Sequence, residues 1–300
     1  MIVPRRDRGH RLDGHPSVIG IRGVCLQRAR LATAVPELPD VERFRVFFAL
    51  HAAGRAVRGV EALDPAIVRN ATPDALENAL RGHRFQEPGR HGKWMLAGTD
   101  GPTLLLHFGM TGDLIWSGDE PDRHRHDRLI LHLAEGELRY RDLRRFGGAW
   151  LAFDAADVAT VTGPLGPDAL DVTREEFLRR LERRRGGVKA ALMDQSLVAG
   201  VGNLIADEVL WQARLHPRTR IQDLDAAARR SLFETLHGVL RRAVDHVDSL
   251  ERERRWLNSV RGLPGATCPR CRTPLERNVA AGRTTYFCPA CQPAPPGPPG

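Results

Sequence analysis

The sequence predicts a multi-domain α+β protein, in which an N-terminal helix and an antiparallel β-sandwich precede a helical domain and a small four-cysteine β-hairpin module. Three observations predict this order. Apolar residues recur at helical spacing after residue 40, and short apolar runs with turn signals fill residues 56–153. Beyond Pro164 the apolar spacing becomes helical again, and four of the five cysteines form two pairs near the carboxyl end.

The length of 300 residues suffices for two domains and a small module. We assign residues 1–35 to a disordered or untranslated extension. The rest divides into a β-sandwich domain, a helical domain, a cysteine module and a disordered tail (36–165, 166–262, 263–292 and 293–300). No apolar run is long enough to span a bilayer, and Val18–Leu26 is too interrupted for a signal peptide. We therefore expect a soluble, cytoplasmic protein with no membrane partner.

The formal net charge of +8 suggests an anionic partner, but much of this charge lies in the extension. Residues 1–35 hold seven arginines and two aspartates, a net charge of +5, which leaves +3 for the rest. Only Lys93 and Lys189 are lysines among the 45 basic residues. A lysine can lose its proton whereas an arginine cannot, so these positions are candidates for roles that need a compact amine.

The individual elements follow from local signals in chain order. Prolines and acidic residues at 36–42 open a helix that ends near Gly54. Seven strands are expected, at residues 56–63, 94–97, 103–107, 114–116, 129–133, 138–140 and 149–153. Gly89–Gly92 is a tight connection and Glu135-Gly136 a hairpin turn. A capping box at Thr173-x-x-Glu176 opens a helix over 174–184, and further helices are expected at 188–194, 204–213 and 226–247.

The cysteines near the carboxyl end indicate a metal site. Cys268, Cys271, Cys288 and Cys291 have the spacing C-x2-C-x16-C-x2-C, which is typical of a tetrahedral four-cysteine zinc site. Since protein fills all four positions, we expect one structural Zn²⁺ that does not bind substrate. The module has few apolar residues, so metal binding would supply its stability. Between the pairs, residues 282–287 are predicted to form a hairpin with Arg283 at its tip.

Several turns carry residues that could bind or react. Lys93 lies on the turn Arg90–Trp94, and the segment His107–Gly112 ends a predicted strand. In Val198–Asn203, the glycines let the backbone approach a ligand closely, and Asn203 is placed to cap the helix that follows. The outward-facing amides at such a helix start suit the binding of a phosphate. Taken singly, each motif also has an ordinary structural interpretation, such as a surface lysine, a core methionine or a glycine turn before a helix.

Together with the stretch Val35-Pro36-Glu37-Leu38-Pro39-Asp40-Val41-Glu42, these motifs resemble the formamidopyrimidine-DNA glycosylase / endonuclease VIII family, bifunctional enzymes that excise oxidised bases. The resemblance covers roughly residues 36–292. It implies a base-excision-repair DNA glycosylase with AP lyase activity, which acts as a monomer on double-stranded DNA that contains damaged bases or abasic sites. It also implies a bacterial, nucleoid-associated protein.

The resemblance further implies roles for individual residues. Pro36 would be the nucleophile and Glu37 the general acid, while Lys93 and Arg283 would contact phosphates at the lesion and assist elimination. DNA-binding roles carry over to His107, Met110, His126, Arg144, Phe146, Lys189 and Asn203. Among these, Met110 would fill the gap left by the extruded nucleotide, and Arg144 and Phe146 would hold the orphan base and wedge the stack.

The implied chemistry requires a free amine at Pro36. An α-amine has a pKa of about 7.7–8, so part of it is unprotonated at neutral pH, whereas a proline inside a peptide bond offers no lone pair. We therefore expect the active protein to begin at Pro36, with Val35 printed where a GTG codon places the initiator methionine. If residues 1–35 are retained, the alternative is a non-catalytic damaged-DNA-binding protein.

Two departures from the family pattern leave the substrate open. The family usually has glutamate where Asp40 stands, and the residues Leu257–Thr267 between Trp256 and the first zinc cysteine are few for a loop that closes over a flipped purine. The expected substrate is an oxidised or ring-opened base, with the pyrimidine-preferring branch of the family as an alternative. A zinc-ribbon module of a larger assembly would explain the cysteines, but not Pro36, Glu37 or Lys93.

Overall fold

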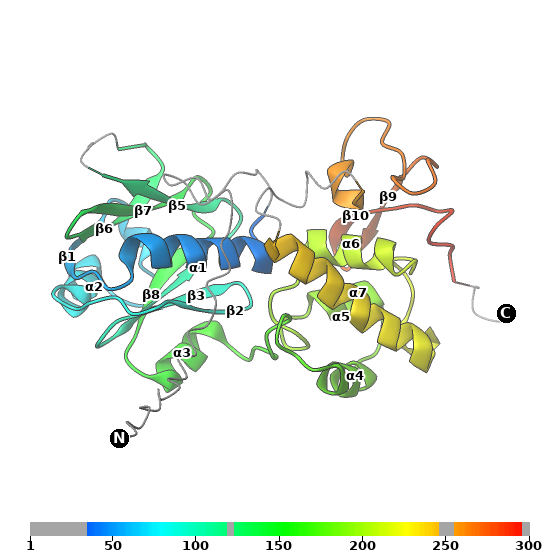
Figure 1. The fold of residues 1–300 in the computed structure, drawn as a ribbon, viewed down its shortest axis with the longest axis horizontal. Helices are drawn as coiled ribbons and strands as arrows, with labels where there is room; N and C mark the ends of the chain where they lie inside the picture. The colour runs from blue at the N-terminus through cyan, green and yellow to red at the C-terminus, as the bar shows by residue number, and fades with distance from the viewer. Residues whose placement is uncertain (1–34, 119–122, 246–254, 296–300) are drawn as a thin grey trace, which may run out of the picture.

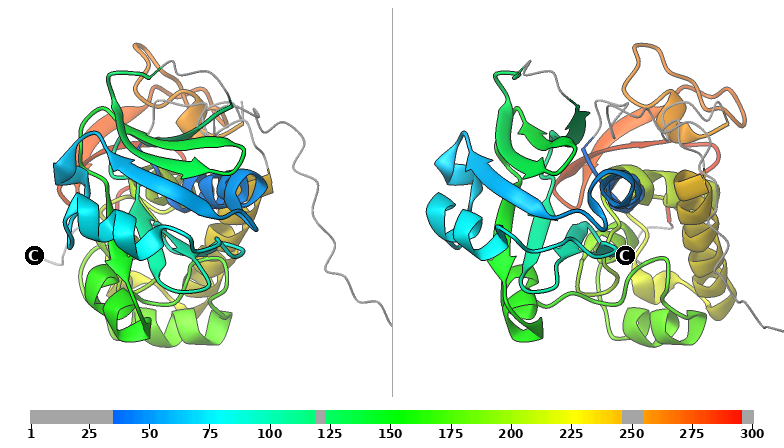
Figure 2. Two further views of the ribbon diagram at one scale, coloured as in Figure 1. Left: turned by 90° about the vertical axis from the view of Figure 1, so that its left-hand side faces the viewer. Right: turned by 60° about the vertical axis from the view of Figure 1, so that its left-hand side comes forward.

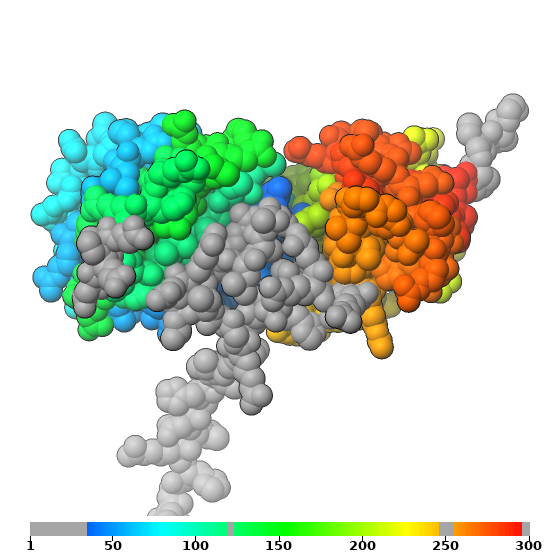
Figure 3. Space-filling model, turned by 90° about the horizontal axis from the view of Figure 1, so that it is seen from above, coloured from blue at the N-terminus to red at the C-terminus, as the bar shows by residue number. Residues whose placement is uncertain are grey.

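The computed structural model describes residues 35–118, 123–245 and 255–295 and shows three parts along its long axis (Figure 1). A β-sandwich lies at one end, and a helical domain with a cysteine hairpin above it lies at the other. Seen from above, the two ends form lobes with a recess between them, at whose floor the start of α1 is visible (Figure 3). In the part of the chain that is described, no helix combines the length and apolar character needed to cross a membrane.

Helix α1 (Leu38–Ala52) joins the two lobes. Asp40 Oδ2 accepts a hydrogen bond of 2.9 Å from the Glu37 backbone N–H, which caps the first turn. Val41, Phe44 and the phenylalanines of the following turn belong to the core of the sandwich, whereas Leu38 belongs to the core of the helical domain. Figure 2 (right) looks nearly along α1 and shows it between the sandwich and the helices.

The sandwich consists of two antiparallel four-stranded sheets. One sheet has the order β1 (Val57–Ala62), β6 (Asp127–Leu133), β7 (Gly136–Asp142), β5 (Gly112–Ser117). The other has the order β2 (Gly89–His91), β3 (Trp94–Gly98), β4 (Thr103–His107), β8 (Gly148–Ala152). The apolar faces of both sheets and of α1 form one core. Each fully buried phenylalanine in this core stabilises the fold by about 1.5–3 kcal/mol relative to an exposed one.

All seven predicted strands are confirmed, but the sequence prediction missed three elements of this domain. The tight connection at Gly89–Gly92 contains the short strand β2. Helix α2 (Pro73–Leu80) buries only two residues, Leu76 and Leu80, and α3 (Ala155–Thr162) buries none. Their capping residues, Thr72 and Asp154, were visible in the sequence, but so short an apolar pattern does not distinguish a helix from a loop.

The helical domain contains α4 (Arg174–Glu182), α5 (Val188–Met193), α6 (Asn203–Gln212) and α7 (Ala226–Asp245), as predicted within two residues at each end. Short 3-10 turns lie at Pro65–Ile67 (η1), Ile221–Asp223 (η2) and Leu257–Ser259 (η3). Gly200 fits tightly against α1, because a Cβ there would meet the Leu38 side chain at 2.4 Å. Its carbonyl also accepts a 3.1 Å hydrogen bond from the Leu38 N–H, so this contact fixes the start of α1 on the helical domain.

The cysteine module is built around the hairpin of β9 (Glu276–Ala280) and β10 (Arg283–Phe287). Its turn places Ala281 and Gly282 at φ of 52° and 67°, a left-handed conformation that favours glycine. Arg283 follows the turn directly, as predicted, but the hairpin spans 276–287, and the predicted segment 282–287 supplies only part of its turn and its second strand. Trp211 of α6 packs against the cysteines and donates its indole N–H to Cys268 Sγ at 3.3 Å, which seats the module on α6.

Candidate active site

A cavity of about 820 Å³ lies between the two lobes. The start of α1, the turn before β3, the end of β4, the start of α6 and the start of β10 all contribute to its lining. Seven of the residues singled out in the sequence line it together: Pro36, Glu37, Lys93, His107, Met110, Asn203 and Arg283. These residues are widely separated in the chain, and the packing of α1 against both lobes brings them together.

Glu37 is the most firmly held of these residues. Only 2% of it is exposed, and its carboxylate accepts hydrogen bonds from the backbone N–H groups of Gly202, Leu204 and Ile205 at 2.9, 2.8 and 3.1 Å. The side chain therefore caps α6 from another domain. Burial raises the pKa of Glu37, while the charge of Lys93 and the hydrogen bonds from α6 oppose the rise.

This arrangement corrects the predicted role of the α6 terminus. Gly202, not Asn203, is the cap residue, and Asn203 is the first residue of the helix. The amides that we expected to face a phosphate are bonded to Glu37 instead. Gly202 permits this approach, since a Cβ at that position would lie 2.3 Å from the Glu37 carboxyl carbon. Asn203 still lines the cavity, and its buried Oδ1 has no hydrogen-bond partner among the described residues.

Lys93 and His107 form the opposite wall of the cavity. Burial lowers the pKa of the Lys93 amine, which the charge of Glu37 partly offsets and that of Arg283 reinforces. Burial and the nearby Lys93 lower the pKa of His107 to about 4, so its ring is neutral at physiological pH. Its Nδ1 accepts a 3.1 Å hydrogen bond from the Gly109 N–H, which leaves the proton on Nε2. The wall thus presents one amine and one neutral ring N–H.

Pro36 is buried at the floor of the cavity, directly before Glu37. In the full chain its nitrogen forms an amide with Val35, a residue that is 40% exposed. Asp40 fits this site although the resembled family usually has glutamate there, because it reaches both the Glu37 N–H and the Arg43 side chain. Its shorter side chain serves the helix cap rather than the cavity, whose lining does not include it.

The hairpin closes the cavity from the zinc-finger side. Arg283 is exposed, and its guanidinium has no hydrogen-bond partner among the described residues, so this group is available to a ligand. Asn203 Nδ2 donates a 3.0 Å hydrogen bond to the Thr284 carbonyl, which fastens β10 to the start of α6. The tip of the hairpin is therefore placed by α6.

Four predicted residues lie outside this cavity. Arg144 and Phe146 lie on the exposed turn between β7 and β8, where the Arg144 guanidinium sits 4.9 Å from the centre of the Phe146 ring. His126 is half-buried before β6, and Arg128 approaches its Nδ1 at 3.3 Å. Lys189 is 1% exposed and forms an ion pair of 2.7 Å with Asp207. Asp207 thus holds the Lys189 amine in the free protein, and the phosphate contact predicted for Lys189 stays a prediction.

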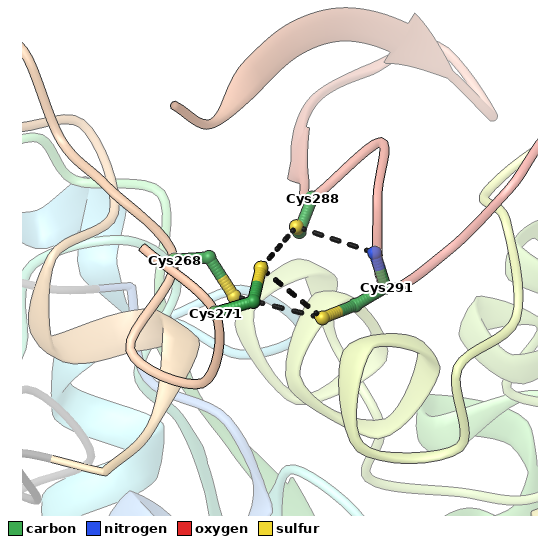
Figure 4. Close-up of side chains that lie close together, drawn as sticks. All are labelled: Cys268, Cys271, Cys288 and Cys291. Atoms are coloured by element: carbon green, nitrogen blue, oxygen red, sulfur yellow. Dashed lines mark hydrogen bonds between the residues drawn. The ribbon is translucent and has the colours of Figure 1, made fainter. Parts of the chain in front are cut away.

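The four cysteines form a cluster that fits a metal ion. Their sulfur atoms all lie within 4.8 Å of one another, and Figure 4 shows them pointing toward a common centre. Tetrahedral Zn–S bonds of about 2.3 Å place sulfur atoms about 3.8 Å apart. The recorded separations of 3.9, 3.4 and 3.5 Å agree with this spacing. The residues present therefore fit a four-coordinate structural metal.

The segment after Trp256 packs against α6 and does not form a loop over the cavity. Asn258 donates from its backbone N–H to Glu208 at 3.1 Å and from its side chain to the Leu204 carbonyl at 3.0 Å. The segment 257–267 thus leaves the cavity uncovered, as its short length led us to expect, and the preference for one class of lesion stays a prediction. The same segment brings Arg261 to the cavity, which the sequence prediction missed because one arginine among 43 carries no signal.

Comparisons with known proteins agree on a single family. Sequence models of the formamidopyrimidine-DNA glycosylase N-terminal domain and of its H2TH domain match residues 35–149 and 165–253, and a model of the zinc finger found in FPG and IleRS matches residues 265–294. The formamidopyrimidine-DNA glycosylase of Herpetosiphon aurantiacus is 37% identical over 275 residues, which cover 86% of this chain and 100% of the relative. That of Acidothermus cellulolyticus is 38% identical and is covered over 98% of its length.

Solved structures give the same result. The Lactococcus lactis formamidopyrimidine-DNA glycosylase bound non-covalently to DNA with an abasic site is similar at a TM-score of 0.79 and 30% identity, over 86% of this chain and 100% of that one. The same Lactococcus enzyme in complex with DNA that contains an oxidised pyrimidine is similar at a TM-score of 0.78 and 29% identity, with the same coverage.

Proposed function

The chain belongs to the formamidopyrimidine-DNA glycosylase family of base-excision-repair enzymes, and from this premise we propose that it is a bifunctional glycosylase and AP lyase that reacts through Pro36. The observation that carries the proposal is the shared cavity. Pro36, Glu37, Lys93 and Arg283 come from three separate parts of the chain and line it together.

In the proposed reaction the Pro36 nitrogen attacks C1′ of the damaged nucleotide and loses its proton, while the bond from C1′ to the base breaks. The C1′–O4′ bond then opens as O4′ takes up a proton, which leaves C1′ and the Pro36 nitrogen joined as an iminium. Glu37 acts as the general acid that protonates the sugar oxygen or the departing base. Its raised pKa supports this role, because a larger fraction of the carboxyl group is protonated near neutral pH. The resulting iminium keeps its positive charge, which acidifies C2′–H and leads to β-elimination and then δ-elimination.

The cations of the cavity would hold the strand while this happens. Lys93 and Arg283 line the space that the sugar–phosphate backbone would occupy, and neither the Lys93 amine nor the Arg283 guanidinium has a hydrogen-bond partner among the described residues. The lowered pKa of Lys93 suits a group that also aids proton removal during β-elimination. The neutral His107 ring would donate its Nε2–H to a phosphate oxygen. Met110 would fill the gap left by the extruded nucleotide.

We further propose that the active form begins at Pro36. The family match begins at residue 35, and relatives are covered along their full length by 86% of this chain. A free prolyl amine has a pKa of about 7.7–8, far lower than that of lysine, so it is the best nucleophile available in the cavity. Val35 borders the cavity beside Pro36, and its removal would also widen the entrance.

Double-stranded DNA with a damaged base or an abasic site is the proposed partner of a monomeric enzyme that holds one structural Zn²⁺. One relative, the Lactococcus lactis enzyme, has been solved with abasic-site DNA, with DNA that contains an oxidised pyrimidine and, as a variant, with DNA that contains Fapy-dG. The proposed substrate is therefore the class of oxidised or ring-opened bases.

Borohydride trapping tests the mechanism. Two forms of the protein, one with residues 1–35 and one that begins at Pro36, are incubated with abasic-site DNA and borohydride. We expect a covalent adduct only for the form that begins at Pro36. In its Pro36→Gly variant a primary α-amine replaces the ring nitrogen, and we expect DNA binding to be kept while strand cleavage slows greatly. If both forms bind damaged DNA and neither is trapped, the protein is a non-catalytic damage binder. If the longer form is trapped equally well, Pro36 is not the nucleophile.

A further inference from the structure

A third cation, which the mechanism above does not use, borders the cavity. Arg261 lies between η3 and the first cysteine pair, and its side chain lines the same cavity as Pro36, Lys93 and Arg283. The side chain keeps 17% of its surface exposed, so it is neither in open solvent nor in the core. Such a position suits a group that meets a ligand within the cavity.

The guanidinium of Arg261 is held in place by three contacts. Its Nε donates to Asp207 Oδ2 at 3.1 Å, and its Nη2 donates to the Thr284 carbonyl at 2.9 Å. The group also lies over the Tyr286 ring, 5.0 Å from its centre. Its third nitrogen, Nη1, has no hydrogen-bond partner within the described segments. The planar fork is therefore fixed in orientation while one of its donors remains available.

The charge of Arg261 is not cancelled by its neighbours. Asp207 is fully buried, and Lys189 already pairs with its carboxylate at 2.7 Å. Asp207 and Lys189 together are neutral, so the cluster of three side chains carries a net charge of +1 at the surface of the cavity. Among the described residues that line the cavity, the only carboxylate is Glu37, and that group is bonded to the α6 amides. A ligand that met Arg261 would therefore be an anion.

We infer that Arg261 binds a phosphodiester oxygen of the damaged strand through Nη1, and that Asp207 is a positioning residue that aims the guanidinium. This inference rests on the proposed function, because the phosphodiester is the anion that a DNA substrate brings into the cavity. Arg261 and Arg283 then contact the strand from adjacent segments, which the Thr284 carbonyl and its hydrogen bonds tie together. A guanidinium fixed in advance loses little conformational entropy when the strand arrives.

A scan of neutral phosphates tests this contact directly. Duplexes carry an uncleavable tetrahydrofuran abasic analogue, and one phosphate at a time near the analogue is replaced by a methylphosphonate. For the wild-type protein we expect a methylphosphonate at one particular position to weaken binding about tenfold, because it removes the charge-assisted hydrogen bond from Arg261. Arg261→Gln has already lost this hydrogen bond, so the same methylphosphonate should not weaken binding of the variant further. Arg261→Gln should also reduce the slope of log Kd against log salt by about one.

Two further variants separate binding from a purely structural role. Arg179→Gln removes an equal charge from α4, a helix on the far side of the domain from β10 (Figure 1), and should leave both readouts unchanged. Arg261→Lys keeps the charge but cannot bridge Asp207 and Thr284. It should recover the salt slope if Arg261 binds phosphate. If Arg261 only fastens β10 to α6, Arg261→Lys will resemble Arg261→Gln, and both variants will show the wild-type methylphosphonate profile, which would overturn the inference.

Borohydride trapping of the form that begins at Pro36 keeps the two proposals distinct. Normal trapping with an unchanged methylphosphonate profile rejects the role of Arg261 alone. Absence of trapping together with absence of preference for the abasic analogue rejects the proposed function, and the inference about Arg261 with it.

Discussion

The wall of the cavity, by which we now mean all the side chains that line it and the segments that hold them, differs from the turn between β7 and β8 in how firmly the free protein fixes its side chains. In the wall, Glu37 is fixed by three backbone hydrogen bonds and Arg261 by Asp207 and Thr284. In the turn, Asp142 fixes the backbone by accepting from the N–H groups of Arg144 and Gly147 at 3.2 and 3.0 Å. The side chain of Phe146, however, is 57% exposed.

The difference fits two kinds of task. Groups that stabilise charge in a reaction act best when they are oriented before the substrate binds. Groups that wedge between bases gain their contacts only when the DNA bends around them, so the free protein has nothing to pack them against. We therefore expect changes in the wall to disturb chemistry and structure, and changes in the turn to disturb only the distortion of the duplex.

The largest expected effect on the wall comes from removing the metal. The cysteine module buries few apolar residues, so loss of one thiolate ligand unfolds the hairpin that carries Arg283. For Cys271→Ser we expect loss of bound zinc, measured by atomic emission, and lesion processing no faster than in Arg283→Ala. Faster processing in Cys271→Ser than in Arg283→Ala would show that the hairpin keeps its shape without metal.

The next largest effect is expected from removal of the general acid Glu37, which should slow base excision more than strand cleavage at an abasic site. In Glu37→Gln the amide cannot protonate the sugar or the base, and we expect excision of a damaged base to slow by about 10²–10⁴-fold. An abasic site has no base left to expel, so strand cleavage there should suffer less. Single-turnover rates on the two substrates measure this ratio. Glu87→Gln, which changes a 70% exposed side chain, is the control, and equal losses on both substrates would contradict the role of Glu37.

A third prediction concerns the stability of the wall and its dependence on pH. Glu208 fastens the segment after Trp256 to α6 and is fully buried, and burial raises its pKa to about 7 from an ordinary value of 4.5. The folded state thus binds this proton more tightly than the unfolded state. The stabilisation is complete below pH 4.5 and is lost as pH rises through about 7.

Relative to Glu208→Gln, wild-type protein should therefore lose up to about 3 kcal/mol of unfolding free energy between pH 4.5 and pH 8. Urea unfolding of both proteins at several pH values provides the difference, in which groups common to the two proteins cancel. A difference that stays constant across this range would mean that Glu208 titrates at its ordinary pKa.

The same contrast explains what could be read from the sequence. The strands and the four-cysteine site followed from local spacing, because their signals lie close together in the sequence. The cap of α6 by Glu37 joins residues 165 apart, and no local pattern encodes it. For this reason we assigned the α6 amides to a phosphate, whereas they bind Glu37. Long-range polar contacts decide which buried groups remain available, and these appear only in the folded structure.

The smallest expected effect belongs to the turn. Phe146→Ala removes an exposed ring that makes few contacts in the free protein, so the melting temperature should stay unchanged. On duplex DNA with a damaged base, loss of the wedge should raise the free energy of extruding the nucleotide by about 1–3 kcal/mol, which slows trapping about tenfold or more. A single-stranded abasic oligonucleotide has no base stack to open, so on this substrate the variant should be trapped at the wild-type rate. Phe153→Ala is a matched control, because this phenylalanine is 67% exposed but lies at the opposite end of β8. An equal loss on both substrates would place Phe146 with the wall of the cavity rather than with the wedge.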